Sequence, residues 1–218
     1  MNSDHAHFLI DIALATSIGD ESLLRRSLSR AASSRVPAAH VREAIFQQVV
    51  FAGIGRTINA FALWETQRPQ RRAEHAEKAV RRRSAAAWRK RGETVCRRIY
   101  GRDYAALRRR MARLHPDLDA WVIEEGYGKV MSRPILGLRC RERMAVTVLA
   151  ALRLWPQLRS HLGGALRIGV TPEDLRESLT AARRTLDVEG RNKLDAIVRR
   201  FRREFGDSTR GGLSKLQV

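Results

Sequence analysis

Apolar residues recur at helical spacing along most of this chain. Between His5 and Ile18 they fill nearly the whole circumference of a helix, which predicts a helix buried on most sides. A second helix is expected over residues 21–33. A third follows a loop, with Pro37 in its first turn, and Gly53 and Gly55 interrupt the apolar stripe that continues beyond it. Similar stripes follow Gly92, so the fold class predicted is all-α.

Breaks in this pattern divide the chain into four segments. Pro69 closes a first group of helices, an Arg-rich stretch follows, and Gly92 opens a second group, which ends before a polar, Gly-rich tail. The predicted organisation is a partial, degenerate helical unit (1–67), a basic linker helix (68–90), a complete helical unit (91–205) and a flexible tail (206–218).

The two groups of helices resemble each other when the chain is compared with itself at an offset of 134 positions. Seven residues then coincide, namely Leu24, Arg25, Leu28, Ala31, Val36, Arg42 and Glu43 with Leu158, Arg159, Leu162, Ala165, Val170, Arg176 and Glu177. The offset also aligns the two loops that precede a helix. In the second loop Thr171 is expected to cap the helix, with Pro172 at its first position and Asp174 completing a capping box. Both groups therefore share a helix–helix–loop–helix plan, which favours an internal duplication.

Composition indicates an ordinary globular protein. Hydrophobic residues make up 44% of the 218 residues. The first apolar stretch is too short to cross a bilayer and contains Asp11, and no Lys or Arg precedes it as in a signal peptide. These features predict a cytoplasmic protein without a membrane partner. Cys96 and Cys140 are too far apart for a CxxC motif, and we interpret them as buried free thiols.

The formal net charge of +19 raises the question of a polyanionic partner. Residues 68–113 contain 17 Lys or Arg and only 4 Asp or Glu, so most of the excess lies in one segment. Aromatic residues that could stack on bases are limited to Trp88 in the linker helix. A solvated helical face is therefore favoured over a nucleic-acid groove, although nucleic acid stays open as a partner.

The stretch Leu138–Glu177 contains the pair of residues with the clearest chemical potential. Glu142 lies near the start of an apolar helix, and His161 lies on the apolar face of the next helix, after a turn at Trp155-Pro156. A carboxylate and an imidazole together can move protons near neutral pH. The hairpin leaves open whether they touch directly or through a water or ligand. In the first unit, Phe8 and Ser27 stand at the corresponding positions, so a site would belong to the second unit.

Three segments and a weaker fourth resemble the carboxymuconolactone decarboxylase and alkylhydroperoxidase-like family. They are RGETVCRRIYGRDY (91–104), EEGYGKVMSRPILGLRCRERMAV (124–146), LRSHLGGALRIGVTPEDLRESL (158–179) and, in the first unit, FAGIGRTINAF (51–61), where Gly55 replaces the usual Pro. The peroxidase branch of this family carries a Glu, a CxxC and a His in that order. Glu142 and His161 match the Glu and the His, whereas Leu154 and Gln157 stand at the cysteine positions. Peroxidase activity is therefore disfavoured, because the dithiol that reduces the peroxide is missing.

The resemblance to the decarboxylase branch implies cofactor-free decarboxylation of 4-carboxymuconolactone or a related small carboxylic acid. His161 would donate or relay the proton and Glu142 would orient it, with no metal required. Arg133, Arg141 and Tyr127 are our candidates for binding the anionic substrate. Members of this family are typically helical rings of subunits, which implies a homo-oligomer. The alternative is a non-catalytic helical oligomer or binding protein on the same scaffold, whose basic linker contacts a polyanion or a partner protein.

Overall fold

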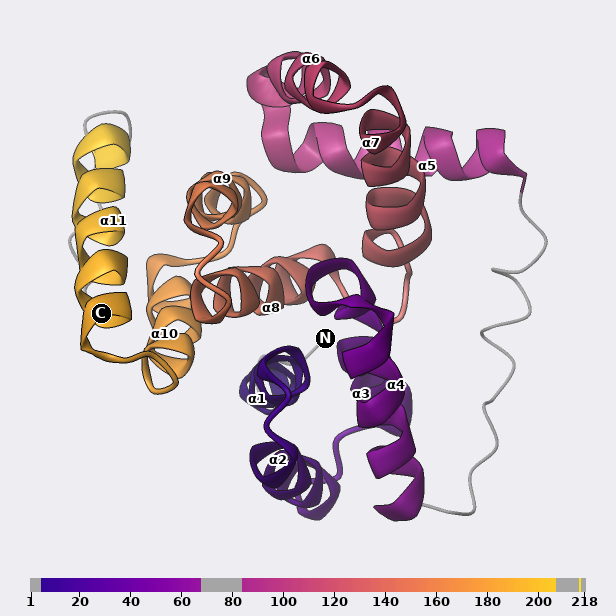
Figure 1. Ribbon diagram of the computed structural model, residues 1–218, viewed down its shortest axis with the longest axis vertical. Helices are drawn as coiled ribbons and strands as arrows, with labels where there is room; N and C mark the ends of the chain where they lie inside the picture. The colour runs from indigo at the N-terminus through magenta and orange to yellow at the C-terminus, as the bar shows by residue number, and fades with distance from the viewer. Residues whose placement is uncertain (1–4, 68–83, 207–215, 217–218) are drawn as a thin grey trace.

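The structure is a computed structural model that describes residues 5–67, 84–206 and Leu216 (Figure 1). These residues form helices and connecting loops, with no strand among them, so the predicted all-α class is confirmed. The helices of the first unit are α1 (Ala6–Ile18), α2 (Glu21–Ser33), α3 (Ala38–Gln47) and α4 (Val49–Gln67). Those that follow are α5 (Ala85–Tyr100), the short 3₁₀-helix η3 (Gly101–Asp103), α6 (Tyr104–Leu114), α7 (Pro116–Trp121), the π-helical η4 (Val122–Met131), α8 (Leu138–Ala151), α9 (Trp155–Arg167), α10 (Pro172–Arg183) and α11 (Val188–Gly206).

Local sequence signals set several of the helix ends. Thr171 and Asp174 form the predicted capping box at the start of α10, with Pro172 in its first turn. Pro37 is the residue before α3 instead of a member of its first turn, which corrects that prediction. Gly53 breaks the helical geometry inside α4 with a φ of 86°, a conformation that favours glycine.

Helix α8 lies at the centre of the molecule (Figure 1). It is buried from Cys140 to Ala150, and it packs against α1, α9 and α10. One hydrophobic cluster joins α1 and α3 of the first unit to α8, through Leu9, Ile12, Ile45, Met144 and Val148. The two units therefore share a core, and residues on α8 are shielded from solvent by both.

Helix α5 crosses the predicted boundary between the linker and the second unit at residues 90 and 91. Gly92, which we interpreted as the start of that unit, lies inside α5. Glycine is needed at this position because the backbones of α5 and η4 approach too closely for a side chain. A Cβ atom on Gly92 would lie 1.9 Å from the carbonyl oxygen of Ile123, and one on Gly128 would lie 2.5 Å from that of Trp88. The rest of the predicted linker helix, residues 68–83, lies outside the described residues.

The two units correspond in backbone detail at the offset of 134. Helices α2 and α9 have bounds that differ by this offset at both ends. The amide of Val36 donates to the carbonyl of Ala31, and the amide of Val170 donates to that of Ala165, both at 2.9 Å. The positions with positive φ also pair, Gly19 with Arg153 and Arg35 with Gly169. These coincidences support the predicted duplication, because chance matches of residue type would not reproduce the turns.

Leu216 is fully buried in the cluster formed by α8–α11, whereas the sequence led us to expect a flexible tail from residue 206. The other residues after Gly206 lie outside the described ones. None of the described helices combines the length and the hydropathy needed to cross a membrane.

Candidate functional site

Glu142 and His161 are in direct contact. The Nδ1 atom of His161 lies 2.9 Å from Oε2 of Glu142, and both residues are buried. An ionised carboxylate can only accept a hydrogen bond, so this contact favours the tautomer of His161 with its hydrogen on Nδ1 and leaves Nε2 outside the contact. The hairpin of α8 and α9 thus brings together the two residues singled out from the sequence, without a bridging group.

Aromatic rings surround this pair. The ring of Tyr100 on α5 and the ring of Phe51 on α4 each lie edge-on to His161, with centroids 6.2 and 6.1 Å away. Tyr127 on η4 donates a hydrogen bond of 3.1 Å to the hydroxyl of Tyr100. Burial raises the pKa of both tyrosines, and the nearby charge of Glu142 raises each further. Both phenols therefore stay protonated at neutral pH and can donate hydrogen bonds.

Tyr127 was a candidate from the sequence, whereas Tyr100 and Phe51 were not. Both lie inside the quoted segments 91–104 and 51–61, but nothing in their spacing relates them to His161. A helical stripe reveals which face of a helix is apolar and does not reveal which distant helix that face meets. The π-helical form of η4, which carries Tyr127, is a feature often found at functional sites.

Arg133 and Arg141 both bind Glu43 of the first unit. A guanidinium nitrogen of Arg133 lies 2.6 Å from Oε1 of Glu43, and one of Arg141 lies 2.5 Å from Oε2. Burial raises the pKa of Glu43, but hydrogen bonds from Arg133 and the charge of Arg141 outweigh this and hold it below its usual value. The structure therefore places these arginines against an internal carboxylate, and their role in binding a substrate stays a prediction.

Comparison with known proteins identifies the region that carries this site. Residues 116–199 match the model of the carboxymuconolactone decarboxylase family. The match covers 84 of the 218 residues, so the similarity to this family is shown for this stretch of the chain. Glu142, His161 and Tyr127 lie within the match, as do α8, α9 and α10, whereas α1–α5 lie outside it. No curated protein matches the chain.

Cys96 and Cys140 are free and buried, as the sequence predicts. Burial raises the pKa of Cys96 to about 12 and that of Cys140 to about 11, so both are thiols at neutral pH. Leu154 and Gln157, which stand where the peroxidase branch has its cysteines, are exposed at the start of α9. The expected lack of peroxidase activity stays a prediction.

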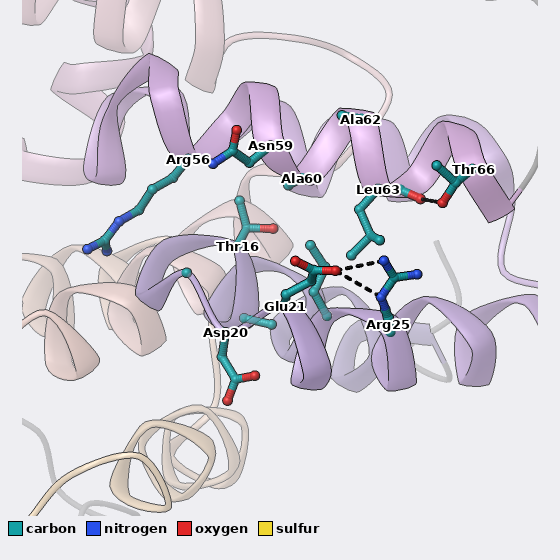
Figure 2. Close-up of a pocket in the computed structure, with 13 residues that line it drawn as sticks. Thr16, Asp20, Glu21, Arg25, Arg56, Asn59, Ala60, Ala62, Leu63 and Thr66 are labelled. Atoms are coloured by element: carbon teal, nitrogen blue, oxygen red, sulfur yellow. Dashed lines mark hydrogen bonds and ion pairs between the residues drawn. The ribbon is translucent and has the colours of Figure 1, made fainter.

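Two sizeable cavities are lined by residues other than Glu142 and His161. One, of about 380 Å³, lies between α1, α2 and α4, where Thr16 has a buried hydroxyl without a partner among the described residues (Figure 2). Another, of about 670 Å³, lies between α1, α2 and α10 and is lined by His7 and Glu177 among others. Within the described part of the chain no cluster of three or more His, Cys, Asp or Glu side chains could hold a metal ion.

Several arginines of the basic segment bind within the chain. Arg108 pairs with Asp119 and Glu93, and Arg89 pairs with Glu124. The guanidinium of Arg97 lies 4.0 Å from the centre of the Tyr104 ring. These contacts pair part of the positive charge of this segment with groups of the same chain, so fewer of its arginines are left to bind a polyanion.

Proposed function

We propose that this protein is a cofactor-free carboxy-lyase that acts on a small lactone or related carboxylic acid. The observation that carries the proposal is the buried 2.9 Å contact between His161 and Glu142, inside a segment that matches the carboxymuconolactone decarboxylase family. Leu154 and Gln157 stand where the peroxidase branch has its two cysteines, which supports a decarboxylase over a peroxidase.

This reaction requires a proton donor and a hydrogen-bond donor near the carbonyl oxygen of the substrate. When the C–C bond to the carboxylate breaks, CO₂ leaves and the electron pair of that bond delocalises toward the lactone carbonyl. A proton must then be delivered to carbon, and a hydrogen-bond donor near the carbonyl oxygen lowers the barrier. We assign proton delivery to Nε2 of His161, while Glu142 holds Nδ1 and stabilises the imidazolium form. The hydroxyl of Tyr100 is the nearest candidate for the donor, because it accepts from Tyr127 and keeps its own hydrogen, so Tyr127 would act by orienting Tyr100.

A spectrophotometric assay tests this proposal. The ultraviolet absorbance of 4-carboxymuconolactone should fall on addition of the protein, and His161→Ala should slow that fall by about 100-fold or more, as expected for the loss of a general acid. His115→Ala is the matched control, because His115 is an exposed histidine at the start of α7. Equal rates for wild type and His161→Ala would end the assignment of His161, and turnover absent from all three proteins would reject this substrate.

A further inference from the structure

The carboxylate of Glu142 makes a single hydrogen bond with the described residues. It is fully buried, its Oε2 meets His161, and its Oε1 has no hydrogen-bond partner among the described residues. A carboxylate without a second partner is not fixed by its own hydrogen bonds. Its position relative to His161 therefore depends on where the backbone of α8 lies.

The first turns of α8 are held by a helix of the other unit. Gln47 of α3 donates from Nε2 to the backbone carbonyl of Arg141 at 2.9 Å, and Arg141 donates from Nη1 to Oε1 of Gln47 at 3.2 Å. Glu43, one turn earlier on the same face of α3, accepts from Nη2 of Arg141 at 2.5 Å. Arg141 immediately precedes Glu142, so these bonds act on the peptide that leads into the site.

The same carboxylate holds the loop that precedes α8. Arg133, in that loop, donates from Nε to both oxygens of Glu43, at 2.7 and 3.0 Å, and its backbone carbonyl accepts from Arg141 at 3.2 Å. We call Glu43, Gln47, Arg133 and Arg141 the α3–α8 latch. Its members are buried or nearly so, and charged hydrogen bonds in such surroundings are strong and directional.

Among the described residues, the positions that correspond to Glu43 and Arg141 do not form a second latch. At the offset of 134, Glu43 corresponds to Glu177 and Arg141 corresponds to His7. Glu177 is half exposed and binds Arg143, which belongs to its own unit. The bonds of the latch thus run toward the helix that carries Glu142. Among the described residues, the second unit reaches α1 of the first through a longer contact of 3.4 Å from Arg184 to Asp11, and not through Glu177.

Phe51 adds a second contact from the first unit to the site. It lies on α4, its ring meets the edge of the His161 ring, and it also packs against the hydrophobic cluster of α8–α11. One unit therefore contacts both members of the pair, Glu142 through the helix backbone and His161 directly.

We propose that the first unit is a working part of the site in the second, with Glu43 and Gln47 as positioning residues for Glu142. The inference rests on the proposed carboxy-lyase function for its kinetic readout, but its structural readout does not need activity. In this arrangement the degenerate unit takes the role that a partner subunit would have, and it does so within one chain.

The experiment compares Glu43→Gln, Glu43→Asp and Gln47→Met with Glu177→Gln. The last variant is the matched control, since it removes the carboxylate at the corresponding position, which binds an arginine of the same helix α8. Ring ¹⁵N chemical shifts of His161 report which nitrogen carries the proton, and steady-state rates report kcat and KM. We expect Glu43→Gln and Gln47→Met to lower kcat by about 10- to 100-fold with little change in KM, as expected for a small displacement of a reacting group. Both should also weaken the preference for hydrogen at Nδ1, and Glu43→Asp should recover part of each effect.

The outcomes separate this inference from the proposed function. If the wild-type protein does not turn over the lactone, the His161 shifts still decide whether the latch positions Glu142. If Glu43→Gln does not fold, Gln47→Met decides, because it retains the charged pairs. Unchanged His161 shifts in a folded Gln47→Met or Glu43→Gln protein would overturn the inference, as would equal changes in Glu177→Gln.

Discussion

Replacing Glu142 by Gln should make the protein more stable and less active. The change removes a negative charge from a fully buried position and leaves the shape of the side chain intact. The reason to expect a gain is Oε1, which is buried and accepts no hydrogen bond from the described residues, so its loss of solvation on folding is not offset by them.

The magnitude follows from two opposing terms. The hydrogen bond from His161 becomes a bond to a neutral group, which costs about 1 kcal/mol. Removing an incompletely paired buried charge should raise the free energy of unfolding by several kcal/mol. The desolvation of one buried ion costs several kcal/mol even after the protein relaxes around it. The net expectation is a gain of about 1–3 kcal/mol in the free energy of unfolding. For a chain of this size, each kcal/mol raises Tm by roughly 2–4 °C.

Urea unfolding followed by circular dichroism measures this change, with the m value expected to stay constant. Decarboxylation should meanwhile fall by about 10²–10⁴-fold, since an amide cannot stabilise the imidazolium. Glu125→Gln is the control, because Glu125 is exposed and pairs with Lys129 one turn later, so its loss should change stability by no more than about 0.5 kcal/mol. A Glu142→Gln protein that is less stable than wild type would refute the reasoning that the carboxylate is under-solvated.

Three further outcomes can be measured by the same methods. Gly92→Ala should unfold at much lower urea concentration than wild type, because its methyl group would meet the carbonyl of Ile123, whereas Gly55→Ala, with open space around it, should be neutral or stabilising by up to about 1 kcal/mol. Thr171→Ala should lose about 1 kcal/mol through the capping box, and an unchanged unfolding midpoint would contradict that role. The pKa of Glu43 is lowered in the folded protein, so its carboxylate should add to the free energy of unfolding. This contribution should be complete above the pKa of Glu43 in the unfolded chain, about 4.3, and should disappear as the pH falls through its pKa in the folded protein. The stability difference between wild type and Glu43→Gln should therefore shrink in acid, and a constant difference from pH 7 to pH 3 would contradict the lowered pKa.

The helices and several of their ends could be predicted from the sequence because the signals for them are local. Apolar spacing locates a helix, and Thr171-Pro-Glu-Asp174 contains its own start signal. Gly92 shows the limit of such signals. A glycine within a polar stretch suggests a boundary, but here it permits the contact between α5 and η4. That contact depends on Ile123, which lies 31 residues later in the chain.

Part of the candidate site could likewise be predicted from local signals, and part could not. Glu142 and His161 could be found because their order and spacing resemble a known family and because both lie on apolar faces. Arg133 and Arg141 were reasonable choices for an anion. Residue type does not reveal that the buried Glu43, 90 residues before Arg133 and 98 before Arg141, accepts their hydrogen bonds. Hydrogen bonds between residues so far apart in the sequence depend on how the two units pack. A local sequence pattern does not predict that packing.

The position of Glu43 and Arg141 on one polypeptide has a consequence for how such a protein responds to dilution and to mutation. Partners on separate subunits meet only at concentrations above their dissociation constant, whereas partners joined by a chain keep a high effective concentration in any volume. The contact also no longer has to work in both directions, as it would across a two-fold axis. Phe8 and Ser27, at the positions that correspond to Glu142 and His161, show the sequence freedom that this asymmetry allows.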